Sequence, residues 1–157
     1  MAITDICKQH CSVAQAVHAV GDTWSLMVLR ELFLGSRRFD DLQRFTGASP
    51  HLLSKRLRAL GAEGIVERRP YQQHPVRHEY RLTDKGLDLW PVIAALRSWG
   101  DRWAAQAAEP PVTVRHRGCG AQVEPVPVCP DCGEPIGARD LALELSPQAR
   151  AQRQAMR

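Results

Sequence analysis

The sequence predicts a mainly α fold of the α+β class, in which short helices carry one two-stranded β-hairpin and a small cysteine-rich β module follows. Three observations support this prediction. Apolar residues recur at helical spacing between positions 13 and 103. Residues 49–81 read as an amphipathic helix, a Gly-containing stop and two strand-like runs around a polar tip. Residues 112–140 combine short valine runs with closely spaced cysteines.

Length and composition limit the class of protein. The 157 residues are 44% hydrophobic and 24% charged, which is ordinary for a globular protein. No apolar run approaches the roughly 20 residues that a membrane span requires, and the first residues lack the apolar core of a secretion signal. We therefore expect a cytoplasmic protein without a membrane partner, whose five cysteines are thiols or metal ligands rather than disulfides.

The chain divides into four zones. Residues 1–103 are expected to form one compact, mostly helical domain. Residues 104–111 read as a linker because two prolines end any helix there. The cysteine-rich module covers residues 112–140, and residues 141–157 form a polar tail that is either weakly helical or disordered.

Caps and stops delimit the first two helices. The first helix has valines at helical spacing in residues 13–20 and is closed by Gly21. Asp22 or Thr23 can cap the second helix, whose apolar face runs as far as residue 33. Gly35 stands just past its end, where a left-handed turn is common.

Two further helices follow at short intervals. The third is brief, with Gly47 as its stop and apolar residues three positions apart at Phe39, Leu42 and Phe45. The fourth runs from about Pro50 to Glu63. Ser49 is a good cap for this helix, and proline is well placed at a first helical position because its missing N–H has no partner there.

A hairpin and a long helix complete the predicted domain. Residues 65–69 and 78–82 can pair as two strands around a tip at 71–77. Thr83 then caps a long final helix, which Pro91 should kink. The apolar stripe of that helix contains Leu87, Trp90, Ile93, Leu96, Trp99 and Trp103.

The fourth helix has two opposite faces when it is placed on a helical wheel. One face should pack on the second and third helices; it holds Leu52, Leu53, Leu57 and Leu60. The other can contact bases or phosphates in a DNA major groove; it holds His51, Ser54, Lys55 and Arg58. Solvation alone would also explain a polar helix face. The short helix before it and the basic hairpin after it favour DNA binding.

Positive charge is concentrated on this helix and hairpin. Residues 49–81 contain seven Lys or Arg and three Glu, a formal charge of +4 that equals the formal net charge of the whole chain. Local positive charge suits a polyanionic partner, although a solvated hairpin would look similar. Arg56 lies beside the leucines and is expected to be partly buried in a salt bridge. The candidate DNA-binding residues are Arg37, Arg38, Ser49, His51, Ser54, Lys55, Arg58, Arg68, Arg69, His74 and Arg77.

Ordered motifs cover residues 11–103. They read Cys11-Ser-Val-Ala, Val20-Gly-Asp-Thr-Trp-Ser-Leu, Leu29-Arg-Glu-Leu, Gly35-Ser-Arg-Arg-Phe, Ser49-Pro-His-Leu-Leu-Ser-Lys-Arg-Leu, Glu79-Tyr-Arg-Leu-Thr-Asp-Lys-Gly and Trp99-Gly. Together they closely resemble HxlR-type winged-helix regulators, relatives of the MarR group. The resemblance implies a homodimeric bacterial transcription factor, usually a repressor and sometimes an activator, whose first and last helices form the dimer interface. The tryptophans of the last helix suit that interface, although burial in a monomer core would also explain them.

Cys11 matches a position where many members of this family have a cysteine at the start of the first helix. The resemblance suggests that it senses oxidants or electrophiles, and a helix N-terminus can favour the reactive thiolate. Here Ser12 replaces the usual proline, and an additional Cys7 could serve as a resolving thiol. An inert cysteine that only packs is the alternative.

Four residues of the module have the spacing of a zinc ribbon. Two residues separate His116 from Cys119 and Cys129 from Cys132, and a Gly follows each pair. One His and three Cys satisfy a tetrahedral zinc ion, and a closed shell of this kind is structural. We expect one zinc ion per chain, with strands near residues 112–114, 123–128 and 136, and folding free energy supplied by the metal. The alternatives are an unmetallated remnant and a redox pair of cysteines.

The residues and the resemblance lead to one predicted function. The protein is expected to be a sequence-specific DNA-binding transcriptional regulator that binds a pseudo-palindromic operator as a homodimer. Of the two types of regulator in the family, the repressor is the expected one. An oxidant or a small molecule could act as its effector. No HExxH, GxSxG or Gly-rich phosphate loop is present in the sequence, so no enzymatic activity is expected. The alternative is a protein-interaction adaptor that uses its winged helix and zinc ribbon without reading DNA sequence.

Overall fold

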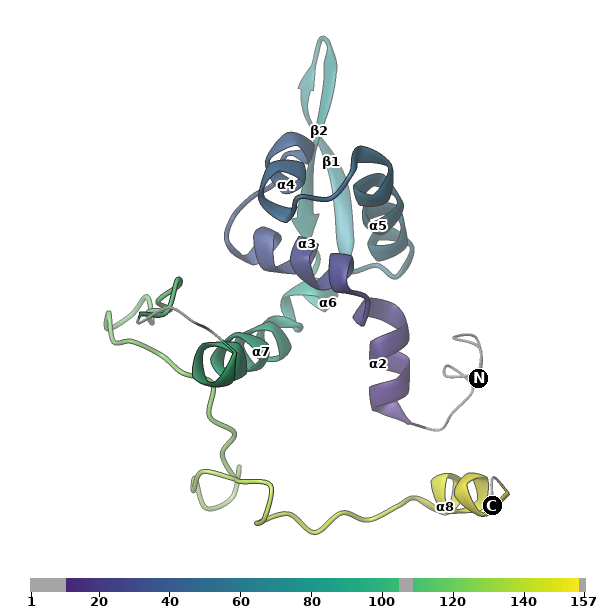
Figure 1. Ribbon diagram of the computed structural model, residues 1–157, viewed down its shortest axis with the longest axis vertical. Coiled ribbons are helices and arrows are strands. Elements are labelled where there is room, and N and C mark those ends of the chain that lie inside the picture. Colours follow the sequence, from purple (N-terminus) through teal and green to yellow (C-terminus); the bar gives the residue numbers. More distant parts are fainter. Residues whose placement is uncertain (1–10, 105–108, 156–157) are drawn as a thin grey trace. The chain divides into compact units, whose positions relative to one another are not determined.

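The computed structural model describes residues 11–104 and 109–155. Its elements, shown in Figure 1, are α2 (Ser12–Val20), α3 (Thr23–Phe33), α4 (Phe39–Thr46), α5 (Pro50–Ala62), β1 (Val66–Gln73), β2 (Val76–Leu82), α6 (Asp84–Leu87), α7 (Trp90–Trp103) and α8 (Pro147–Ala155). The first of two compact units takes in the described residues up to Trp90 together with the segment from Leu145, and the second comprises Pro91–Glu144. No helix in the described part of the chain is both long and apolar enough to span a bilayer.

The core of the first unit lies between α3, α4 and α5. These three helices contact one another, and α5 also contacts β1. The largest fully buried apolar side chains are Val28, Leu29, Leu42, Leu53, Leu60 and Ile65. Each such side chain contributes roughly 1.5–3 kcal/mol when it leaves water. Apolar burial therefore holds α4 and α5 on α3 as a helix-turn-helix pair.

The predicted caps and stops of these helices are confirmed. The Asp22 carboxylate accepts hydrogen bonds from the backbone N–H groups of Trp24 at 3.1 Å and Ser25 at 3.2 Å. Ser49 caps α5 by accepting from the N–H of Leu52 at 3.3 Å. Gly47 ends α4 with φ +74°, a left-handed conformation that glycine adopts without strain. These local interactions set where α3, α4 and α5 begin or end.

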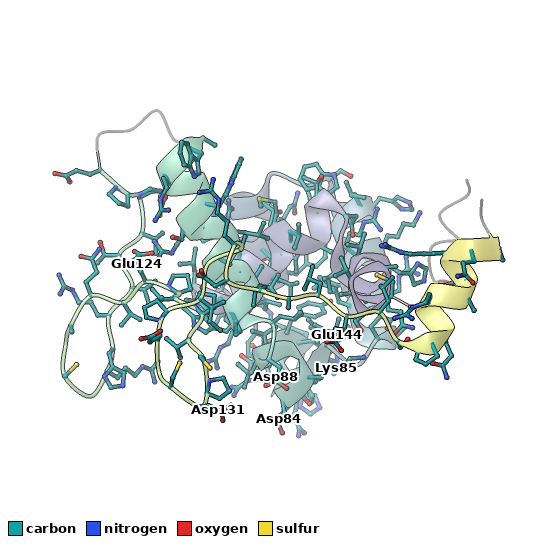
Figure 2. All side chains as sticks on the ribbon, turned by 90° about the horizontal axis from the view of Figure 1, so that it is seen from below. Asp84, Lys85, Asp88, Glu124, Asp131 and Glu144 are labelled. Carbon is teal, nitrogen blue, oxygen red and sulfur yellow. The ribbon has the colours of Figure 1, made fainter. Side chains whose placement is uncertain are left out.

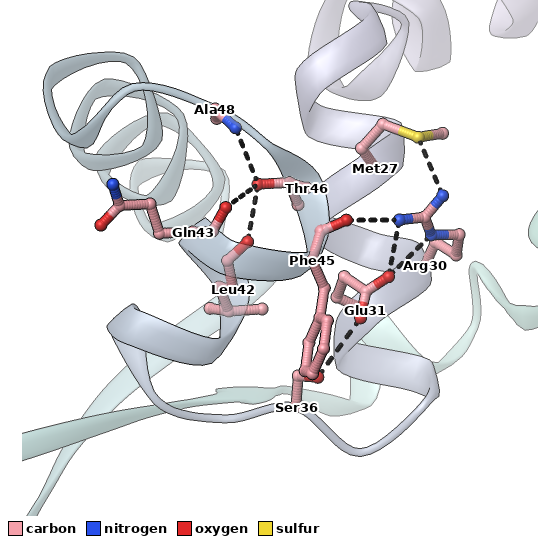
Figure 3. Close-up of polar contacts among 9 residues, drawn as sticks. All are labelled: Met27, Arg30, Glu31, Ser36, Leu42, Gln43, Phe45, Thr46 and Ala48. Atoms are coloured by element: carbon pink, nitrogen blue, oxygen red, sulfur yellow. Dashed lines mark hydrogen bonds and ion pairs between the residues drawn. The ribbon is translucent and has the colours of Figure 1, made fainter.

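A polar network around a buried carboxylate connects α3 to the turn before α4 and to the end of α4 (Figure 3). Glu31 is only 5% exposed. One of its oxygens accepts from Arg30 Nε at 2.8 Å, and the other accepts from the Ser36 hydroxyl at 3.3 Å. Arg30 also donates to the carbonyl of Phe45 at 3.1 Å. A buried charge is costly without such partners, so the network defines how the turn before α4 and the end of α4 lie on α3.

The hairpin is longer than predicted. Antiparallel pairing runs from Val66 with Leu82 to Gln73 with Val76, so both strands extend into the residues that were assigned to the tip. Cross-strand backbone hydrogen bonds tolerate polar side chains, which is why composition placed the strand ends too early. The register shifts between Pro70 and Gln72, and this irregularity leaves Tyr71 out of the pairing.

Residues 83–103 form two helices where one kinked helix was predicted. Thr83 is the expected cap: its hydroxyl accepts from the N–H of Gly86 at 3.2 Å and donates to the carbonyl of Gly64 at 2.6 Å. The helix that it caps, α6, ends at Leu87, and α7 begins at Trp90. Pro91 is the second residue of α7, where a missing N–H loses no hydrogen bond. Proline therefore starts a new helix here.

The second unit contains α7 and a series of turns. The predicted strands of the module reduce to two isolated bridges, which join Arg115 to Gln122 and Val128 to Pro135. Every described residue in 109–144 is half-exposed or exposed, so no buried apolar face holds longer strands together. Residues 105–108 of the predicted linker lie outside the described residues. The polar tail includes α8.

Candidate nucleic-acid interface

The polar face of α5 is open to solvent. His51, Lys55 and Arg58 are exposed and Ser54 is half-buried, whereas the leucines of the opposite face are buried or, for Leu52, half-buried. The Arg58 guanidinium lies along its own helix and donates to the carbonyl of Ser54 at 3.3 Å. The described part of the chain leaves this face uncovered, which is a condition for entering a DNA groove.

Arg56 has the structural role that its position predicts. Its side chain is 28% exposed, and its Nε lies 3.0 Å from the Asp22 carboxylate. The alignment is that of an ion pair rather than a hydrogen bond, because Nε has no hydrogen-bond partner among the described residues. Asp22 therefore both caps α3 and ties α5 to it.

A cavity of about 480 Å³ lies beside α5, between the start of α4 and the hairpin. Its lining includes three arginines, Arg38, Arg68 and Arg77, together with Ser54 of the α5 polar face. The Arg38 guanidinium lies over the Tyr71 ring, 5.0 Å from its centroid. Arg68 contacts His78 Nδ1 at 3.0 Å. The cavity thus extends the basic surface from α5 onto the hairpin.

The backbone holds Arg37 and Arg38 beside the hairpin. The carbonyl of Arg37 accepts from the N–H of Tyr80 at 2.8 Å, and the backbone of Arg38 forms an isolated antiparallel β-bridge with that of Glu79. Both arginine side chains are exposed. The segment before α4 therefore lies against β2, and Arg38 lines the cavity there.

The arginines of the hairpin differ in how far acids neutralise them. Arg69 pairs with Glu67 at 2.5 Å, and Arg81 pairs with Glu79 at 2.6 Å. Within residues 11–104 and 109–155, no carboxylate forms a salt bridge with Arg68 or Arg77, and none does so with Lys55 or Arg58 of α5. Arg69 is consequently a weaker candidate for DNA contact than the sequence alone indicated. His74 lies exposed at the hairpin tip.

Sequence reasoning missed the tyrosines of this surface. Tyr71 and Tyr80 line the cavity, and Tyr71 orients Arg38. Their roles depend on the shifted register after Pro70 and on the pairing of residues 37–38 with β2. Neither contact has a signal in local composition, because both join segments far apart in the chain.

The cysteine of the first helix is placed as its motif suggested. Cys11 is exposed and occupies the N-cap position of α2, where its side chain forms no capping hydrogen bond. Cys7 lies outside the described residues. The structure therefore leaves the Cys11 thiol accessible to a reagent in solution.

The structure forms the two predicted ligand pairs separately. His116 Nδ1 lies 3.3 Å from Cys119 Sγ. The backbone N–H groups of Cys132 and Asp131 and the Cys132 thiol lower the pKa of Cys129, while burial opposes them. Among residues 11–104 and 109–155, no three His, Cys, Asp or Glu side chains gather as a group that could hold a metal ion. Zinc binding by all four residues stays a prediction.

A helix-turn-helix pair with an exposed second helix, followed by a basic antiparallel hairpin, defines a winged-helix DNA-binding domain. The HxlR-like helix-turn-helix family model matches residues 19–108, and the chain belongs to this family. The resemblance inferred from the motifs is thus confirmed. The protein is a helix-turn-helix transcriptional regulator, a class that binds DNA.

Similar proteins extend the match into the second unit. An uncharacterized HTH-type transcriptional regulator of Mycobacterium tuberculosis H37Rv, Rv3095, is 42% identical over 153 residues, which are 96% of this chain and 97% of its own. PA1607, a candidate transcription factor of known structure, aligns with 90% of this chain and 99% of its own, with 32% identity and a TM-score of 0.79. The redox regulator HypR in its oxidized form aligns with 57% of this chain and 94% of its own, with 32% identity and a TM-score of 0.54.

Proposed function

We propose that the protein is a sequence-specific repressor that binds a pseudo-palindromic operator as a homodimer and responds to thiol oxidation. The observation that carries DNA reading is the uncovered polar face of α5, continuous with the three arginines of the cavity beside the hairpin. Lys55 and Arg58 are suited to guanine or phosphate, and His51 and Ser54 to base edges. Repression follows the usual behaviour of the family that the motifs resemble.

The homodimer would place two copies of α5 in successive major grooves, about one helical turn apart. An exposed apolar stripe on α7 supports this assembly; it contains Val92, Leu96, Trp99 and Trp103. Their spacing puts all four on one helix face. Trp99 is 62% exposed and Trp103 is 71% exposed, which is costly for a face of this kind in an isolated chain. We propose a second copy of the chain as its partner.

The decisive test of whether the protein recognises a specific DNA sequence is selection of preferred duplexes from a random pool by the full chain. A two-fold symmetric preferred sequence is expected, and placing it in a reporter promoter should lower transcription when the protein is present. Binding that weakens with salt but shows no sequence preference would refute specific reading and favour the adaptor.

Sedimentation tests the dimer separately. Trp99→Glu places a charge in the exposed face of α7 and is expected to give a monomer. Leu143→Glu is the matched control, since Leu143 is 89% exposed and lies outside that face. A native chain that sediments as a monomer, or a Trp99→Glu chain that remains dimeric, would contradict the proposed interface.

The thiol response rests on the exposed Cys11 at the start of α2 and on the similarity to the redox regulator HypR. Two thiols, Cys11 and Cys7, would release two protons and pass two electrons to an added oxidant as a disulfide forms. Operator affinity measured with and without diamide should differ for the native chain and stay constant for Cys11→Ser. Equal oxidant effects in both chains would exclude Cys11.

A further inference from the structure

The described turns of the second unit lack a buried apolar core. The described residues in 109–144 include none that is buried, and Val126 and Val128 are both more than half-exposed. A segment this small with no apolar core lacks the usual source of folding free energy. Another interaction must supply part of the stability of its well-defined turns.

The two turns of this segment have the same backbone pattern, 13 residues apart. We name residues 114–123 the first turn and residues 127–136 the second turn. The N–H of His116 donates to Ala121 and that of Cys129 to Glu134, both at 2.9 Å. The N–H groups of Gly120 and Gly133 return to His116 and Cys129, both at 2.8 Å. The two turns are therefore equivalent at their centres.

The equivalence extends to the ends of both turns. Val123 donates to Val114 in the first and Ile136 donates to Pro127 in the second, each at 2.9 Å. The bridges from Arg115 to Gln122 and from Val128 to Pro135 occupy matching positions. Gly120 and Gly133 have φ of +74° and +73°, which glycine adopts without strain. Two copies of one hairpin turn thus stand in one unit.

The matching positions of the two turns carry side chains that bind metals. The first and fourth residues of the central loop are His116 and Cys119 in one turn, and Cys129 and Cys132 in the other. The 3.3 Å separation of His116 Nδ1 and Cys119 Sγ is close to the roughly 3.6 Å between nitrogen and sulfur in a tetrahedral zinc site. The backbone geometry of the turns does not by itself require His or Cys at these positions, so their presence there needs another explanation.

We propose that these side chains of both turns bind one structural zinc ion. The four ligands are His116, Cys119, Cys129 and Cys132. Three thiolates and one imidazole favour zinc over hard cations such as magnesium or calcium, and four protein ligands leave no position for a reactive water. The two ligand pairs do not gather as one group in the described residues. Binding of one ion would bring the pairs together and supply the folding free energy that the segment lacks.

A residue of α7 shows where the metal-bound module would be anchored. Arg97, whose side chain is 17% exposed, lies 3.0 Å from Glu124 and 2.8 Å from Asp101. It also donates to the carbonyl of Val112 at 3.4 Å. Val112 and Glu124 flank the first turn, and Glu124 is labelled in Figure 2. One arginine therefore holds both ends of that turn on α7, in the same unit.

Metal content of the full chain tests the proposal without reference to DNA binding. Protein purified under reducing conditions without chelators should contain about one zinc ion per chain by elemental analysis. Cys129→Ser and Cys132→Ser should each lose most of the zinc, whereas Cys11→Ser should retain it. Circular dichroism should show helices in all four chains, since the ligands lie outside them. Zinc-free native protein that takes up no added zinc, or full occupancy in Cys129→Ser, would overturn the proposal.

Cobalt tests the geometry and the fourth ligand. The metal-depleted chain titrated with Co²⁺ should develop thiolate-to-metal charge transfer and the strong visible bands of a tetrahedral site. His116→Ala should weaken Co²⁺ binding at least tenfold, and His116→Cys should restore it with altered bands. A reduced chain in which Co²⁺ shows octahedral bands, or His116→Ala with unchanged affinity, would contradict the four-ligand site.

Discussion

The winged-helix unit and the turns of residues 109–144 obtain their order in different ways. In the first, Leu53 and Leu60 are fully buried between packed helices. In the second, no described residue is buried, and two turns with the same backbone pattern carry His or Cys at matching positions. The contrast shows that one chain can combine a module stabilised by apolar burial with one whose proposed stabilisation is a metal ion. Substitutions should therefore have different effects in the two regions.

The largest expected difference concerns apolar truncation. Leu60→Ala removes a side chain with 0% exposure, and it should lower the free energy of unfolding by about 2–5 kcal/mol. Val128→Ala, at a residue that is 54% exposed, should change it by less than about 0.5 kcal/mol. Urea unfolding followed by circular dichroism measures both. Similar losses in the two variants would show that the second region has an apolar core after all.

Two glycines differ in the space around their backbone. A Cβ on Gly86 would lie 2.2 Å from the carbonyl oxygen of Ile65, so Gly86→Ala should destabilise the winged-helix unit by about 1–3 kcal/mol. Gly100 in α7 has nothing within 4 Å of the corresponding position. Gly100→Ala should instead stabilise that helix by up to about 1 kcal/mol. Thermal unfolding distinguishes a loss of stability from a gain, and a neutral Gly86→Ala would refute the close approach of α6 to the Ile65 carbonyl.

A third comparison asks which region reads DNA. Arg58→Ala should weaken operator binding by about 1–3 kcal/mol if the guanidinium contacts a base. The free energy of unfolding should stay nearly constant, because Arg58 is exposed. Arg139→Ala removes an exposed cation from the second unit and serves as the control. Fluorescence anisotropy at one fixed salt concentration compares them. Equal losses would indicate binding through net charge alone.

The smallest effect concerns the link between α3 and α5. Asp22→Ala removes a helix cap and an ion pair together and should cost about 0.5–2 kcal/mol. Arg56→Ala removes only the ion pair, whose partners are each about a third exposed; it should cost about 0–1 kcal/mol. A double-mutant cycle isolates the pair. A coupling energy near zero would mean that the cap, rather than the ion pair, is what Asp22 contributes.

Local chemistry explains which predictions succeeded. Ser49 as a cap and Gly47 as a stop act on neighbouring backbone groups, so the sequence around them was sufficient to place α4 and α5. The polar face of α5 followed from helical periodicity alone. By contrast, the hairpin ends and the break before α7 depended on cross-strand hydrogen bonds and on Pro91 starting a helix. Composition carries little information about such choices.

By itself, the sequence determined the helix order, the caps, the leucine face of α5, the family and the repeated spacing of candidate zinc ligands. Only the tertiary structure decided that Glu31 is buried between Arg30 and Ser36, and that Tyr71 lies under Arg38. It also decided that Arg69 is paired while Arg68 is not. The physical reason is range: capping and helical periodicity act within a few residues, whereas burial and side-chain pairing depend on segments that only folding brings together.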